Sequence, residues 1–143
     1  MMPTFQISPE ALGAIVRRAR QARPRECCDI LVGTREAVVE AVQTRNLARE
    51  PTRFLIDPRG HIEARRDARR RGLKVVGFYH SHPQTAPYPS PRDLTEASYS
   101  DCLYLIVSVA RGRAETKLFR LAGGGFVEVG LVVQNTSLAP GCT

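Results

Sequence analysis

Two histidines and an aspartate near the middle of the chain form the pattern with the most chemical meaning. His80 and His82 stand two residues apart at the end of an apolar run, and Asp93 follows eleven residues after His82. Because alternate side chains of a strand point to the same face, both imidazoles can converge on one point. Two neutral imidazoles and a carboxylate, with a fourth position open, are the ligand set of a catalytic zinc site. The spacing therefore predicts a zinc-dependent hydrolase.

The same residues have structural explanations that must be weighed. Ser90-Pro91-Arg92-Asp93 is a capping box, with serine at the N-cap and an acid three residues later. A histidine at the end of a strand is often only hydrogen-bonded. The capping role does not exclude metal binding, because an aspartate in the first helical turn is held ionised by the helix dipole. Chance rarely supplies the joint spacing of all four residues, so it favours a metal site.

A zinc hydrolase also needs a general base and a group that stabilises the oxyanion. Zinc lowers the pKa of its water toward ~7, and a carboxylate that is not a ligand takes the proton. Glu26, just before the strand expected from Cys28, is the candidate base, although spacing alone leaves it an exposed charge. The Ser90 hydroxyl could donate to the oxyanion, and losing one such donor costs ~10²–10³ in turnover.

Taken together, these residues resemble the motif of the JAMM (MPN+/JAB) zinc metalloproteases, most of all their small single-domain bacterial branch. The resemblance also covers the segments 24–33, 54–58 and 76–83, and Asn46. It implies a cytidine-deaminase-like α/β fold and a zinc ion held by His80, His82 and Asp93 with water as the fourth ligand. It further implies that Glu26 acts as base and then as acid toward the leaving amine, and that Ser90 stabilises the oxyanion.

The substrate implied by the resemblance is the peptide or isopeptide bond after the C-terminal Gly-Gly of a ubiquitin-like protein, in bacteria typically a sulfur carrier. Only a tail without side chains passes closely beneath a buried metal. Asp29 stands where family members often have glycine, which predicts an altered substrate channel or an added acid near the site. The loop 84–89 is short, so the long insertions with which larger relatives grip ubiquitin are missing.

The elements that position these residues follow from local signals. Helices are expected from Ser8-Pro9 to about Ala22, ended by Pro24, from Asp57-Pro58 to about Arg71, and from Pro91 to about Ser100. Strands are expected at residues 5–7, 28–32, 37–42, 54–56, 102–109, 116–121 and 126–133, and over the apolar run from Leu73 that has His80 and His82 at its end. The order predicts an α/β fold, a mixed β-sheet flanked by about three helices. One domain is expected over residues 1–134, followed by a poorly ordered tail at 135–143, with His61 on the surface.

The composition is that of an ordinary globular protein, with 43% hydrophobic and 24% charged residues in 143. No apolar run is long enough to span a membrane, and the N-terminus lacks the features of a signal peptide, so a cytoplasmic location is expected. Four cysteines without a C-x-x-C pair predict buried small hydrophobic residues and one loose thiol at Cys142, rather than a disulfide framework.

Two other functions remain open at this point. The net charge of +7 suits a nucleic-acid-associated JAB-like protein, but no helix-turn-helix, zinc finger or aromatic-interleaved basic strand supports nucleic-acid binding. An inactive MPN scaffold is disfavoured by the full set of motif residues. The arginines crowded at positions 65–71 are a solvated helix face or a docking surface for an acidic partner. The oligomeric state is open, with a homodimer as one option.

Overall fold

The structure is a computed structural model that describes residues 4–51, 53–97, 99 and 101–134. In chain order its elements are β1 (Thr4–Ile7), α1 (Pro9–Ala22), β2 (Cys28–Gly33), β3 (Ala37–Gln43), α2 (Pro58–Arg70), β4 (Lys74–His82), α3 (Pro91–Glu96), β5 (Leu103–Ser108), β6 (Glu115–Ala122) and β7 (Gly125–Val133). The predicted α/β class with three helices is confirmed.

The seven strands form one mixed sheet that closes into a barrel, in the order β1-β3-β2-β4-β5-β6-β7. Strand β1 pairs in parallel with both β3 and β7 and so joins the two ends of the sheet. Strands β4 and β5 are also parallel, and the remaining pairs are antiparallel. Sequence patterns predicted the strands but not the closure, because the β1–β7 pairing joins segments far apart in the chain.

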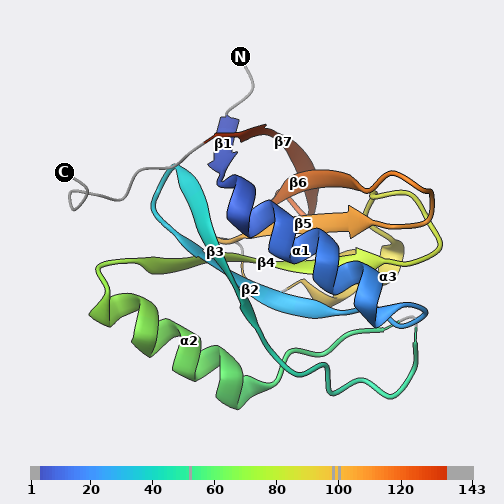
Figure 1. The fold of residues 1–143 in the computed structure, drawn as a ribbon, viewed down its shortest axis with the longest axis horizontal. Coiled ribbons are helices and arrows are strands. Elements are labelled where there is room, and N and C mark those ends of the chain that lie inside the picture. The colour runs from blue at the N-terminus through green and yellow to red at the C-terminus, as the bar shows by residue number, and fades with distance from the viewer. Residues whose placement is uncertain (1–3, 52, 98, 100, 135–143) are drawn as a thin grey trace.

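Helix α1 packs across one face of the sheet (Figure 1). Its start follows from the sequence: the Ala11 N–H donates to the Ser8 side chain, and Pro9 occupies the first turn. Its buried side chains Ala11, Ile15 and Ala19 join a core that includes Leu31, Val38, Tyr79, Leu105 and Leu118. This helix is thus the predicted amphipathic cover.

Helix α2 lies on the opposite side of β2 and β4 (Figure 1). Asp57 caps its start, and Gly72, with φ +74°, follows its end. Ala64 and Ala68 pack on Ile30, Val32, Phe78 and Tyr104. Since Ile30 and Val32 alternate with Leu31, which joins the α1 core, the two faces of β2 serve two different cores. Side chains on the α2 face and on the α1 face are therefore separated by the sheet.

Strand β4 carries the central histidines, and its fit against β5 depends on Gly77. A Cβ atom at position 77 would lie 2.2 Å from the Leu103 carbonyl oxygen. The parallel register then places His80 beside Ile106 and His82 beside Ser108. Close packing at Gly77 thus fixes where both imidazoles stand relative to β5.

Two expected elements differ. The predicted strand at 54–56 is absent: only Ile56 forms a bridge, with Asn46. The Asn46 side chain hydrogen-bonds to the backbone of this part of the chain: it accepts from the Leu55 N–H and donates to the Arg53 carbonyl. Helix α3 ends at Glu96 rather than near Ser100, because Ala97 is extended and the Tyr99 backbone bonds to the Tyr104 hydroxyl.

Two further expectations concern the tail and membranes. The predicted tail at 135–143 lies outside the described residues. In the described part of the chain, the helices are too short and too polar to cross a bilayer.

Candidate metal centre

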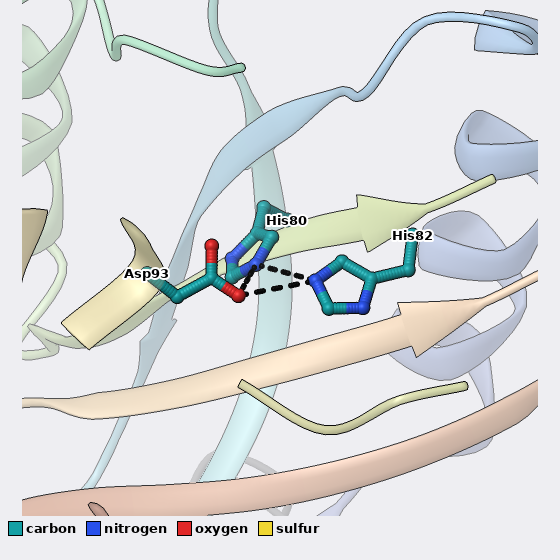
Figure 2. A group of neighbouring side chains, drawn as sticks. All are labelled: His80, His82 and Asp93. Atoms are coloured by element: carbon teal, nitrogen blue, oxygen red, sulfur yellow. Dashed lines mark hydrogen bonds and ion pairs between the residues drawn. The ribbon is translucent and has the colours of Figure 1, made fainter. Parts of the chain in front are cut away.

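His80, His82 and Asp93 lie together as the sequence predicted. Figure 2 shows the two imidazoles at the end of β4 and the carboxylate of α3 pointing toward one another. The Nε2 atoms of His80 and His82 are 3.2 Å apart, and each lies 3.1 Å from Asp93 Oδ2. Ligand atoms of a tetrahedral site with ~2.0–2.1 Å bonds stand about 3.3 Å apart. The three atoms therefore have nearly the spacing that one zinc ion requires.

The protonation of His82 fits this role. Its Nδ1 lies 2.9 Å from the Ala86 carbonyl oxygen, which can only accept a hydrogen bond. Nδ1 therefore carries a proton, and Nε2 is the ring nitrogen that faces Asp93 and His80 and can give its lone pair to a bound cation. A carbonyl partner on the other nitrogen is the usual way in which proteins fix the tautomer of a metal-binding histidine. The donor set thus fits a divalent cation such as zinc.

The electrostatics of the three groups favour ligation. Burial disfavours the Asp93 carboxylate, but hydrogen bonds from His80 and His82 outweigh it and lower the pKa of Asp93 well below its usual range. Burial lowers the pKa of His80, which keeps that imidazole neutral. The pKa of His82 is raised, because the Asp93 carboxylate and the Ala86 carbonyl outweigh the effect of burial. A cation placed among these groups would compete with the proton on His82.

The predicted capping box positions Asp93. The Asp93 N–H donates to Ser90 Oγ at 3.0 Å, and the Ser90 N–H donates to Asp93 Oδ2 at 2.9 Å. Because the Ser90 oxygen is the acceptor, its O–H hydrogen remains available, and the described residues offer it no acceptor. Cap and oxyanion donor are thus compatible roles for Ser90.

Glu26 lies beside the same site. Its N–H donates to the Pro51 carbonyl, and its carbonyl accepts from the Asn46 side chain. The pairing of β2 with β4 continues past Cys28–His80, since the Ser81 N–H donates to the Cys27 carbonyl. Burial, opposed by His82 and supported by Asp93, raises the pKa of Glu26 to about 7. A half-buried carboxyl with that pKa suits a general base at neutral pH.

A cavity of ≈ 580 Å³ adjoins the metal centre. His80 and Asp93 form part of its wall, and most of the remainder is apolar or aromatic, including Phe54, Phe78, Tyr104 and Phe126. Phe54 stacks on the His80 ring, with centroids 4.4 Å apart. The cavity therefore leads from the candidate ligands along the α2 face of the sheet.

The sequence predicted that His61 lies on the surface, and this prediction is wrong. His61 is half-buried in the cavity wall, with its ring edge-on to Phe78 at 5.2 Å and to Tyr99 at 5.6 Å. The Arg65 Nε–H donates to His61 Nε2, and burial together with the Arg65 charge lowers the pKa of His61. No acid or second histidine is placed in the sequence to form a site with it, so no local signal marked it.

Asp29 lies away from the candidate ligands, so it does not add an acid to the metal centre. Its side chain points to the α1 face of β2, is 1% exposed, and pairs with Arg18. It also accepts hydrogen bonds from the Tyr79 hydroxyl and the Thr44 N–H. The strand alternation that brings Cys28 to the same face as His80 puts Asp29 on the other one. Asp29 is a structural ion-pair partner.

A comparison with protein-family models shows which family this chain is related to. Residues 8–122 match the model described as prokaryotic homologs of the JAB domain. The chain belongs to this family. Its similarity to the JAMM/JAB motif, expected from the residues, is thereby confirmed.

Curated relatives of this JAB-domain chain carry the names of enzymes. A desampylase of Haloferax volcanii is 34% identical over 111 residues, which cover 73% of this chain and 80% of that protein. A CysO-cysteine peptidase of Mycobacterium tuberculosis is 29% identical over 125 residues, covering 85% and 86% of the two chains.

Solved structures agree with the fold. A protein from Desulfitobacterium hafniense superposes with a TM-score of 0.85 at 30% identity, covering 92% of this chain and 94% of that one. A JAB1/MPN domain protein from Archaeoglobus fulgidus gives a TM-score of 0.60 at 24% identity, over 90% and 98% of the chains. The architecture around the candidate site is thus that of JAB/MPN domains.

Proposed function

We propose that this protein is a zinc-dependent metallopeptidase that hydrolyses the peptide or isopeptide bond after the C-terminal Gly-Gly of a ubiquitin-like, sulfur-carrier protein. The observation that carries the proposal is the triangle of His80 Nε2, His82 Nε2 and Asp93 Oδ2, with 3.1–3.2 Å sides, beside a carboxyl whose pKa is about 7. The proposed catalytic domain is residues 1–134, of which the family model covers 8–122.

In the proposed mechanism His80, His82 and Asp93 hold the zinc. Bound there, zinc would act as a Lewis acid and lower the pKa of a water molecule. Glu26 takes the proton from the attacking water and then delivers it to the leaving amine. The Ser90 O–H donates to the oxyanion that develops on the scissile carbonyl. The Ala86 carbonyl keeps His82 in the tautomer that presents Nε2.

The relatives' names and the cavity support the substrate class. One relative is a peptidase acting on CysO-cysteine, and another is a desampylase. Beside the metal centre, the apolar cavity offers space for residues that precede the scissile bond. A glycine pair is the part of a tail that brings its backbone closest to His80 and Asp93. We place the reaction in the cytoplasm, where the free, buried Cys27, Cys28 and Cys102 stay reduced.

The proposal is tested with a ubiquitin-like sulfur carrier of the same organism, extended by a short peptide beyond its Gly-Gly. Mass spectrometry should find cleavage after the second glycine by the zinc-loaded protein. Glu26→Gln should retain zinc and lose ~10³-fold or more in rate. Cleavage elsewhere, or undiminished turnover by Glu26→Gln, would contradict the proposal.

A further inference from the structure

A second cleft of ≈ 580 Å³ lies at the other end of β4. Its walls come from β1, the turn after β2, α2, the start of β4, the residues that lead into β5 and the last part of β6. Backbone pairing brings these segments together, since Gly33 pairs with Lys74 and Leu103 pairs with Arg120. Lys74 and His82 are eight residues apart on one strand, about 26 Å. The cleft is thus separate from the metal centre.

The cleft carries a strong excess of positive charge. Four cationic side chains line it, Arg35, Arg65, Lys74 and Arg120, against one acid, Asp101. Within the described part of the chain, none of these four forms an ion pair. Elsewhere the protein does pair its cations, as Arg71 with Glu40 and Lys117 with Glu128 show. Like charges gathered around a concavity attract and concentrate an anion.

Arg65 is held in place before any ligand arrives. Its Nε–H donates to His61 Nε2 at 2.8 Å, and its guanidinium lies over the Tyr99 ring, 5.9 Å from the centroid. These contacts orient the planar group while its terminal nitrogens remain donors. A guanidinium fixed in this way loses little conformational entropy on binding and matches the oxygens of a phosphate.

Apolar side chains also line the cleft, among them Phe5, Val76 and Leu103, which belong to the core beneath α1. Cations beside apolar side chains suit an anion that also carries an organic ring. The volume of the cleft falls in the ~300–1,000 Å³ range of small-molecule sites. A concave cleft of this size holds a compact ligand rather than a long stretch of nucleic-acid backbone.

We propose that this cleft binds a phosphate-bearing small molecule of nucleotide size. Arg35, Arg65, Lys74 and Arg120 contact the phosphates, and the ring system rests on Phe5 and Leu103. The inference does not depend on the reaction proposed for the metal centre, because the two sites share no lining residue.

Isothermal titration calorimetry on the full-length, zinc-loaded protein tests the proposal, with ATP and tripolyphosphate as probes at physiological ionic strength. ATP should bind more tightly than tripolyphosphate. Arg35→Gln/Arg120→Gln should weaken ATP binding about tenfold or more, because it removes two charge-assisted contacts. The matched control Arg17→Gln/Arg111→Gln removes the same charge from exposed positions outside the cleft, and it should change the affinity less than twofold.

Three outcomes would overturn the proposal. The first is an equal loss in both double variants, which would assign binding to net charge. The second is loss of ATP binding in His80→Ala, which would place the phosphates on the metal. The third is binding of a 20-nucleotide single-stranded RNA that ATP does not displace, or no binding of either phosphate probe. Thermal unfolding of each variant without ligand separates a lost contact from a lost fold.

Discussion

At the scale of single residues, the candidate site is built from side chains that satisfy two demands at once. Ser90 caps α3 with its oxygen while its hydrogen stays free, and Asp93 closes the capping box with the same oxygen that faces both histidines. Such residues can be predicted from sequence, because a helix cap and a set of metal ligands each have a characteristic spacing along the chain. The residues that surround them have no such spacing, so no local sequence pattern predicted the positions of Ser108 and His61.

Glu26 is expected to destabilise the metal-free protein at neutral and alkaline pH. Burial raises the pKa of Glu26 from 4.5 to about 7, so the folded state binds the proton more tightly than the unfolded state does. The free energy of unfolding is therefore highest, with respect to this group, below pH ~4.5, and it falls as the pH rises through 7. Glu26→Gln should therefore raise the free energy of unfolding by about 1 kcal/mol at pH 8, after allowance for its partial exposure. Urea denaturation with a chelator present measures this.

The same titration at pH 4 serves as the control for Glu26. There the wild-type carboxyl is mostly protonated in both states, and the two proteins should unfold at nearly the same urea concentration. In the zinc-loaded enzyme, the ion's charge moves the acid limb of the activity profile below pH 7, because the base must be ionised to take a proton. If Glu26→Gln were less stable than the wild type at pH 8, burial could not be what raises the pKa of the Glu26 carboxyl.

Ser108 should act on the metal through His82. Its hydroxyl donates to the Thr85 carbonyl at 2.6 Å, and this anchors the loop whose next carbonyl, at Ala86, accepts from His82 Nδ1. Ser108→Ala should lower zinc affinity about tenfold, as loss of outer-shell support does elsewhere. Competition with a chromophoric chelator measures the affinity.

A purely structural role for Ser108 would give a different pattern. In that case Ser108→Ala would lower the melting temperature of the metal-free protein and leave zinc affinity unchanged. Ser108→Thr keeps the hydroxyl and should restore most of the affinity. Failure of threonine to do so, in a variant that folds normally, would count against the anchoring role.

At the scale of elements, the alternation of side chains across β2 and β4 decides which residues reach the site. Asp29 faces α1, whereas His80 and His82 face the side of the sheet that carries the cavity. Helix starts and most strands were predictable because caps and β-branched runs are local signals. The 54–56 segment was not, since it forms only one bridge and the Leu55 N–H bonds to the Asn46 side chain, a partner that no local pattern reveals.

Gly77 is expected to be intolerant of any side chain. An added Cβ would meet the Leu103 carbonyl oxygen at 2.2 Å, so β4 and β5 would have to separate. Gly77→Ala should lower the free energy of unfolding by about 2–3 kcal/mol and displace both histidines from Asp93. Urea denaturation and zinc content measure the two effects.

Gly13, exposed in α1, is the matched control for Gly77. Nothing lies within 4 Å of a Cβ at that position, so Gly13→Ala should raise stability by about 0.5–1 kcal/mol. If both alanine variants behaved alike, the close approach of β4 and β5 could not be the reason for glycine at position 77.

At the scale of the whole molecule, the barrel places two chemically different sites at the two ends of β4. The candidate metal centre gathers a carboxylate and two imidazoles, and the opposite cleft gathers cations. The net charge of +7 was visible in the sequence, but the gathering of Arg35, Arg65, Lys74 and Arg120 around one cleft was not, because it depends on the pairing of β2, β4, β5 and β6.

Removal of the proposed zinc ion should destabilise the whole domain, because an ion held by His80, His82 and Asp93 would tie β4 to α3. Any ligand that binds only the folded state stabilises it by RT ln(1 + [L]/Kd), about 4 kcal/mol at 1,000 times the Kd. For a chain of this length, that corresponds to a fall in Tm of about 10 °C on chelation. Scanning calorimetry with and without a chelator measures the shift.

Asp93→Asn separates this effect from general damage by the chelator. Asparagine keeps an oxygen that can accept from the Ser90 N–H, so the cap survives, but the charge that attracts the metal is lost. The variant should melt near the metal-free wild type and should not respond to chelator or to added zinc. A chelator-induced fall in Tm that persists in Asp93→Asn would mean that the stabilising ion sits elsewhere, since no other ligand of the triangle carries a negative charge.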